Sequence, residues 1–149
     1  MELSASEREL LLEETQALIE RVREPQRAQY VELRAALQGE ALAEESVGAL
    51  EKLLALELRT GRVRKIHGPM AESAFMRLYQ KTPTGSALAK STAQVNEALA
   101  ALEGQTLEHI AFAPKSPGVF TLDLETEEYR VHLEIREEGV WLREVGVDL

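Results

Sequence analysis

The 149-residue chain is acidic, with 26 aspartates and glutamates against 17 lysines and arginines and a formal net charge of −9 at pH 7. It contains no cysteine, which excludes disulfides, thiolate nucleophiles and cysteine-ligated metal sites. The length suits one domain that can fold without covalent cross-links. We therefore predict a single domain over residues 1–149, with a helical part in 1–103 and an antiparallel sheet in 105–149.

The first residues carry neither the basic start nor the apolar block of a signal peptide, and the sequence has no run of about 18 uncharged apolar residues. We expect a cytoplasmic protein that does not enter a membrane. The negative net charge also argues against nucleic acid as a partner, because that binding depends on cations meeting phosphate.

Two helices are predicted before residue 40. Ser4 and Ser6 each precede a glutamate by three residues, which is the spacing of a capping box, and the helix that follows runs to about Arg23. Its apolar stripe includes Leu11 and Leu18. The second helix lies between a proline and a glycine and has one apolar side, with the residues Pro25, Tyr30, Leu33, Leu37 and Gly39.

A third helix, within residues 40–59, is rich in leucine, and we expect it to be the most buried helix because apolar residues cover more than one face. Those residues are Leu42, Val47, Leu50, Leu53, Leu54, Leu56 and Leu58. Gly61 is placed to end this helix in the left-handed conformation.

A fourth helix is predicted to open at Gly68-Pro69 and to break at Thr82-Pro83-Thr84-Gly85. A fifth begins near Ser86 and ends at Gly104. Its apolar residues Leu88, Val95, Leu99 and Leu102 fit the alternating steps of a coiled-coil seam. Packing within the chain and a dimer seam both stay open, and the shortness of the seam favours the first.

After Gly104 the apolar residues alternate, which predicts strands. The first strand lies near residues 107–113, and a turn follows at 114–118. A turn at residues 125–128 would place apolar residues opposite each other on one face of the next hairpin and polar residues on the other. The expected pairs are Leu124–Tyr129, Leu122–Val131, Phe120–Leu133, Asp123–Arg130 and Thr121–His132.

The last hairpin allows two registers. A three-residue loop, Glu137-Glu138-Gly139, uses the glycine in a left-handed position and is preferred. It pairs Ile135 with Trp141, Val131 with Val145 and Tyr129 with Val147, turns Arg143 toward the core, and leaves Val140 and Leu142 as an apolar spot on the polar face. A longer loop opposes Leu133 to Leu142 instead, and a bulge could reconcile the two registers.

These elements predict an α+β fold with about five N-terminal helices packed on a C-terminal four-stranded antiparallel β-meander. Trp141 is expected to be half-buried opposite Ile135.

Positive charge is concentrated in residues 59–96, where seven cations and one acid give a local charge of +6 against −15 for the rest of the chain. Two predicted helix starts lie in this segment, and free N–H groups there favour anions. The candidate anion-binding residues are Arg62, Arg64, Lys65, His67, Arg77, Lys81, Gly85 and Ser86. The favoured alternative is that these cations pair with acids of the protein itself or of a partner.

Catalytic and metal sites are not predicted. The three histidines are His67, His109 and His132, and none stands in a legible catalytic set. His132 and Glu134 alternate on one strand, but two ligands make an incomplete metal site. No cofactor is implied.

We therefore expect a non-enzymatic interaction or regulatory module that self-associates or binds another protein. Its candidate interface residues are Leu88, Val95, Leu99, Val140 and Leu142. The alternative is a binding protein or enzyme for a small phosphate- or carboxylate-bearing ligand held by residues 59–90.

Overall fold

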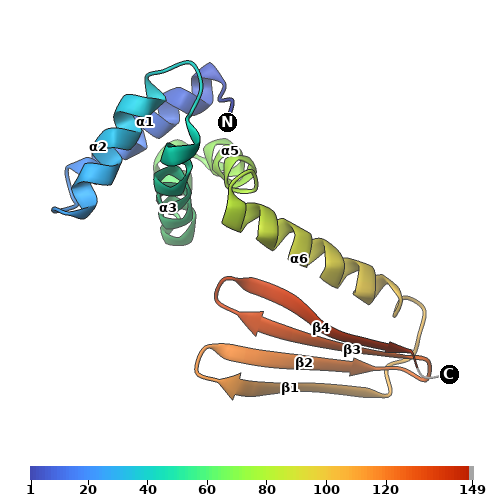
Figure 1. Ribbon diagram of the computed structural model, residues 1–149. Coiled ribbons are helices and arrows are strands. Elements are labelled where there is room, and N and C mark those ends of the chain that lie inside the picture. Colours follow the sequence, from blue (N-terminus) through green and yellow to red (C-terminus); the bar gives the residue numbers. More distant parts are fainter. Residues whose placement is uncertain (148–149) are drawn as a thin grey trace. The chain divides into compact units, whose positions relative to one another are not determined.

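The computed structural model describes residues 1–147, which form six helices followed by four strands (Figure 1). The helices are α1 (Ala5–Ile19), α2 (Gln26–Leu37), α3 (Glu44–Thr60), α4 (Arg62–His67), α5 (Pro69–Tyr79) and α6 (Pro83–Ala100). The strands are β1 (His109–Ser116), β2 (Val119–Glu125), β3 (Tyr129–Arg136) and β4 (Gly139–Val147). Neighbouring strands are antiparallel in the order β1-β2-β3-β4, which confirms the predicted α+β class and the meander.

The chain divides into two compact units. The helical unit is Met1–Gly85, and the sheet unit runs from Ser86 onward. The first residues of α6 belong to the helical unit and the rest of α6 to the sheet unit. Within residues 1–147, no helix has both the length and the apolar character that crossing a bilayer requires. That the whole chain makes one domain stays a prediction.

The start of α1 is fixed by the predicted capping box. The Ser4 hydroxyl accepts from the Glu7 N–H at 3.1 Å, and the Ser4 N–H donates to the Glu7 carboxylate at 2.8 Å. The helix ends at Ile19, earlier than the expected Arg23, and Pro25 stands directly before α2. The reciprocal bonds satisfy backbone donors that a helix start otherwise leaves unpaired.

α3 contributes to the core of the helical unit, but it is not the most buried helix, as it was predicted to be, since four of its 17 residues are buried against five of 15 in α1. Leu50, Leu53 and Leu54 are fully buried there, and Gly61 ends the helix at a φ of 69°. α1, α2, α4 and α5 also contribute to this core, and its other buried residues include Leu11, Leu18, Leu33, Leu37, Val63, Phe75 and Leu78. Each such side chain contributes roughly 1.5–3 kcal/mol when it leaves water.

α4 was not predicted. Its six residues are too few to show a helical period, and only one of them, Val63, is buried. The fifth predicted helix is therefore α6. It begins at Pro83 rather than near Ser86, because proline suits a helix start as well as a helix end.

The core of the sheet unit lies between α6 and one face of the sheet (Figure 1). Val95 and Ala98 of α6 pack with Leu124, Val131 and Leu133 of the strands, and all five are buried. Partly buried residues surround this cluster, namely Leu99, Leu102, Leu122, Val140 and Leu142. β1 begins at His109 and runs on through Pro114, so the turn after it is tighter than predicted.

The β2–β3 register differs from the prediction by two residues. Leu124 pairs with Val131, Leu122 with Leu133, Phe120 with Ile135, Asp123 with His132, and Thr121 with Glu134. Thr126 causes the shift. Its N–H donates to the Tyr129 carbonyl at 2.8 Å, and its hydroxyl accepts from the Tyr129 N–H at 3.0 Å, which closes the turn around Glu127 and Glu128. A shift of two residues keeps each side chain on its predicted face.

A bulge in β4 combines the two registers considered for the last hairpin. Val131 pairs with Val145 and Tyr129 with Val147, as predicted, and the register then shifts between His132 and Leu133. Beyond the shift, the preferred register is wrong, since Ile135 pairs with Val140 and Trp141 lies opposite Glu134. Val140 and Leu142 therefore share the helix-covered face, and Arg143 bonds Glu134 instead of entering the core.

Candidate functional site

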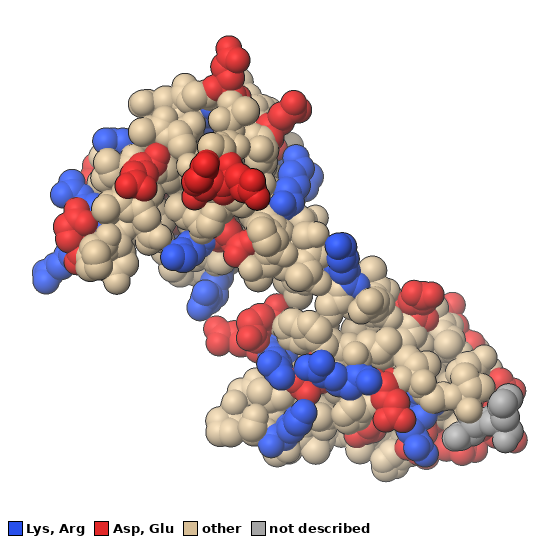
Figure 2. All heavy atoms as spheres, viewed as in Figure 1, with Lys and Arg blue, Asp and Glu red and all other residues tan. Residues whose placement is uncertain are grey.

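The residues predicted to hold an anion make different contacts instead of forming one basic site. They are distributed over α4, α5, the turn after α5 and the first turn of α6. Acidic and basic side chains are interspersed on the surface seen in Figure 2. The side chains of Lys65 and Arg77 are exposed and make no hydrogen bond or ion pair with any residue in 1–147. Arg64 pairs with Glu72 at 3.2 Å in a partly exposed contact.

Two of the predicted anion ligands bind one internal carboxylate, that of Glu14 in α1. Arg62 donates from Nε to Glu14 Oε2 at 2.8 Å, and His67 Nε2 lies 2.7 Å from Glu14 Oε1. Glu14 is buried, so this is an interior contact and not a surface ion pair. The interpretation that the cations pair with the protein's own acids therefore holds for Arg62, as it does for Arg64.

A second carboxyl, that of Glu57 in α3, is buried beside Glu14 and is 3% exposed. Arg62 Nε lies 3.7 Å from Glu57 Oε2, beyond hydrogen-bond distance, and this oxygen has no hydrogen-bond partner among the described residues. Burial and the adjacent Glu14 raise the pKa of Glu57 to about 7, against the weaker influence of Arg62 and Arg21. Burial also acts to raise the pKa of Glu14, but bonds from His67 and Arg62 outweigh it and lower that pKa.

Sequence reasoning passed over both acids, although a signal was present. Glu14 lies three residues after Leu11 and four before Leu18, so it shares their apolar stripe. Glu57 lies four residues after Leu53 and three after Leu54, on the same buried side of α3. An acid at a core position of a helix is rarely buried without a partner, and this rule could have drawn attention to both.

The predicted anion site at the start of α6 is filled by another residue of the protein, Glu51 of α3. Its carboxylate accepts from the Thr84 N–H at 2.9 Å and from the Thr84 hydroxyl at 2.6 Å. The Gly85 N–H donates to the Thr82 hydroxyl at 3.2 Å. A Cβ at Gly85 would lie 1.8 Å from the Tyr79 carbonyl oxygen, so the glycine is needed for close packing rather than for a ligand.

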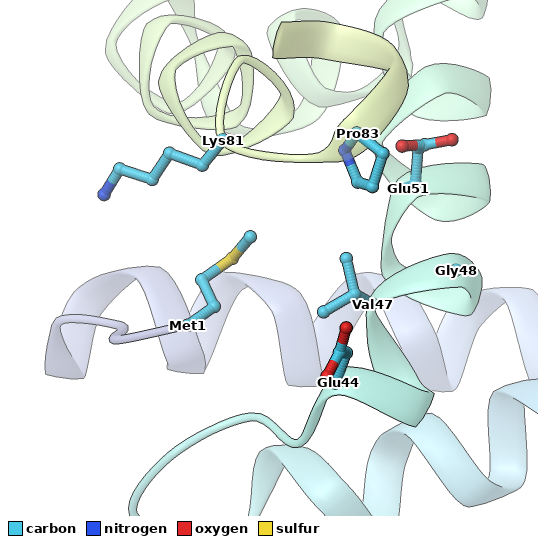
Figure 3. A pocket seen from close by; sticks show the side chains of 7 residues that line it. All are labelled: Met1, Glu44, Val47, Gly48, Glu51, Lys81 and Pro83. Carbon is cyan, nitrogen blue, oxygen red and sulfur yellow. The ribbon is translucent and has the colours of Figure 1, made fainter.

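An open pocket of about 670 Å³ lies beside this helix start (Figure 3). Its lining residues are Met1, Glu44, Val47, Gly48, Glu51, Lys81 and Pro83. Lys81 is the one predicted anion ligand that lines it, and its side chain extends away from both glutamates in Figure 3. Two carboxylates and one cation make the lining unfavourable for an anion.

The five predicted interface residues pack within the sheet unit. Val95 is buried, and Leu99, Val140 and Leu142 lie against its cluster. Leu88 packs on Gly139, where an added Cβ would be 2.2 Å from Leu88 Cδ1. The α6 seam and the β4 spot thus cover each other, and their role in self-association stays a prediction.

α6 leaves one part of the same sheet face uncovered. Ile110 and Phe112 of β1 are 62% and 61% exposed, and Phe120 of β2 is 37% exposed. The rings of Phe112 and Phe120 stack with centroids 5.3 Å apart and an angle of 10° between their planes. β1 is an edge strand, so this apolar surface lies at a border of the sheet.

The opposite sheet face centres on Glu134, which is 0% exposed. Its carboxylate accepts from Arg143 at 3.1 Å, Lys115 at 2.9 Å and Arg136 at 2.6 Å, and these cations hold the pKa of Glu134 well below its usual range. His132 bonds Asp123, so neither member of the considered metal pair is free. In residues 1–147, no group of three or more histidine and acidic side chains is arranged to hold a metal ion.

Comparison of the chain with protein-family models, with curated proteins and with solved structures finds no match.

Proposed function

We propose that this protein is a non-enzymatic interaction module that self-associates through the uncovered part of its sheet. The observation that carries the proposal is the exposed stack of Phe112 and Phe120, with Ile110 beside it on the face that forms the core of the unit. Single exposed apolar residues are ordinary, but a contiguous apolar group is typical of a binding surface, and aromatic residues dominate interface energies.

A second copy of the chain suits this surface because the surface carries no charge. The β1 and β2 residues on this face are Ile110, Phe112, Pro114, Phe120, Leu122 and Leu124. Each chain has a net charge of −9, yet two such faces can meet without placing like charges opposite each other. A twofold axis joins the same patch on both subunits, and an apolar patch is complementary to itself.

The alternative, a small anionic ligand bound by residues 59–90, has less support. Arg62 and His67 are engaged by Glu14, Arg64 by Glu72, and the Thr84 N–H by Glu51. An added anion would have to compete with these internal carboxylates.

Sedimentation velocity over a concentration series tests self-association. We expect wild-type protein to form a dimer at micromolar concentration. Phe112→Asp places a charge in the centre of the patch. We expect it to raise the dissociation constant of the dimer by at least about 30-fold, because loss of a central aromatic costs about 2 kcal/mol or more.

Met70→Asp is the matched control, because Met70 is 84% exposed but lies in α5 of the helical unit. It should dimerise like the wild type. A wild type that stays monomeric at high micromolar concentration, or a Met70→Asp variant that dissociates as readily as Phe112→Asp, would contradict the proposal.

A further inference from the structure

We propose that the paired carboxyls of Glu14 and Glu57 form a proton-binding site, and that the attachment of α4 to the helical unit depends on the proton held there. Both glutamates lie in the helical unit, so this site is independent of the proposed sheet interface.

α4 is attached mainly by its two ends and one apolar side chain. Arg62 at its first position and His67 at its last both bind Glu14, and Val63 is fully buried. Glycines bound the helix, Gly61 with a φ of 69° and Gly68 with a φ of 91°. Glycine adopts such angles without strain and moves readily between them and others, so α4 lies between two points where the backbone can turn.

Glu57 needs its proton because its surroundings cannot support a second negative charge. An ionised carboxylate at its position would be buried, with Oε2 lacking a hydrogen bond. The protonated form can instead donate to Glu14, which is the neighbour that raises the pKa of Glu57. Two adjacent carboxyls commonly hold one proton between them for this reason.

Few cations near the pair could offset the second negative charge that appears when Glu57 loses its proton. Arg62 is the nearest cation to Glu57, but its Nε bond goes to Glu14. Two more charges act on this group: Glu13 of α1 acts on Arg62, and Arg21 after α1 acts on Glu57. Arg34 of α2 bonds Gln16, and Glu72 of α5 pairs with Arg64.

Loss of the proton therefore acts directly on α4. An ionised Glu57 repels Glu14 and competes with it for Arg62, the residue that attaches the start of α4 to α1. We expect α4 to be ordered while the pair holds its proton and to open more often once the proton leaves.

Nuclear magnetic resonance on the full-length chain tests both parts of the inference. The carboxyl carbon of Glu57 should titrate near pH 7, far above an ordinary glutamate. Hydrogen exchange of the α4 amides, corrected for the intrinsic exchange rate, should show protection factors that fall by about tenfold or more between about pH 5 and pH 8. A tenfold change corresponds to one pKa unit.

Glu57→Gln keeps a neutral hydrogen-bonding side chain and should hold α4 protection constant over this pH range. Glu45→Gln is the control, because it removes an exposed carboxylate from the first turn of the same helix, and it should behave like the wild type. An ordinary titration of Glu57 in the wild type would overturn the inference without any variant, and so would an equal loss of α4 protection in Glu57→Gln.

Discussion

Glu57 in the helical unit and Glu134 in the sheet unit are both buried glutamates, yet their pKa values move in opposite directions. Glu134 accepts bonds from Arg143, Lys115 and Arg136, and its pKa is held low. Glu57 lies beside another carboxyl, and its pKa rises to about 7. Burial is common to both, so the number of cations available to each acid decides the direction.

The comparison also separates two roles for a buried acid. Glu134 gathers cations from β1, β3 and β4 and so connects strands across the sheet. The Glu14–Glu57 pair connects α1, α3 and α4 with an excess of carboxyl over guanidinium groups. The first arrangement stabilises the ionised form at neutral pH, and the second makes protonation a condition of stability.

The largest effect is expected from Glu14→Ala. This change leaves Arg62 and His67, whose side chains are 24% and 12% exposed, without their shared partner. Breaking a fully buried pair on one side costs about 3–5 kcal/mol, which is the upper limit for this partly exposed one. Urea unfolding monitored by circular dichroism would measure the loss in the helices, while the fluorescence of Trp141, the one tryptophan, reports on the sheet unit.

Glu9→Ala is the control for this change, because Glu9 is an exposed acid of the same helix and its loss should cost no more than about 0.5 kcal/mol. Equal costs for the two variants would show that the Glu14 contacts contribute nothing measurable.

The second effect is a fall in stability as the pH rises from about 4.5 to about 7. The pKa of Glu57 is higher in the folded than in the unfolded chain, so its contribution is complete below the unfolded value and is lost as the pH passes the folded value. The full loss would be at most about 3 kcal/mol. Glu14 does not oppose this trend, because its lowered pKa affects stability only below the ordinary glutamate range.

Unfolding free energies at a series of pH values measure this slope, and Glu57→Gln should remove it. A wild-type curve that is flat between these pH values would contradict the assignment of a raised pKa to Glu57.

The smallest effect is expected from Glu134→Gln. The partner cations keep roughly half of their side-chain surface in water, which can replace part of the lost contact. Because the pKa of Glu134 is lowered, its contribution is present above the ordinary glutamate value and is lost as the pH falls below it. The unfolding free energy followed by Trp141 fluorescence should therefore fall less steeply with decreasing pH in the variant than in the wild type. The same acid dependence in both proteins would contradict the stabilising role of the three cations.

The sequence was most informative where one local pattern decides the structure. The Ser4 and Glu7 spacing predicted the start of α1, and Gly61 predicted the end of α3. The alternation after Gly104 predicted four antiparallel strands but not the register between β2 and β3, because Thr126 closes a tighter turn than the glutamates around it suggested. The bulge near Arg143 was one of the possibilities, since each uniform register left one misplaced residue.

The candidate sites were harder to predict because they depend on contacts between distant segments. The excess of cations in residues 59–96 was real, but Glu14, the acid that binds Arg62, lies outside that segment. Glu51, which accepts from Thr84 at the start of α6, lies outside it as well. The apolar residues of α6 and β4 were both identified, yet only the fold shows that they pack on each other. The exposed Phe112 surface follows from how far α6 extends over the sheet, which no local pattern encodes.

The bond between Glu51 and Thr84 has a consequence for dividing the chain into fragments. A fragment that starts at Ser86 begins inside α6 and lacks Thr84, so the first turn of that helix would fray with unpaired N–H groups. A fragment that ends at Gly85 keeps the bond but retains too little of α6 to remain helical. Since one helix serves both units, we expect each fragment to be less stable than the same segment is in the intact protein.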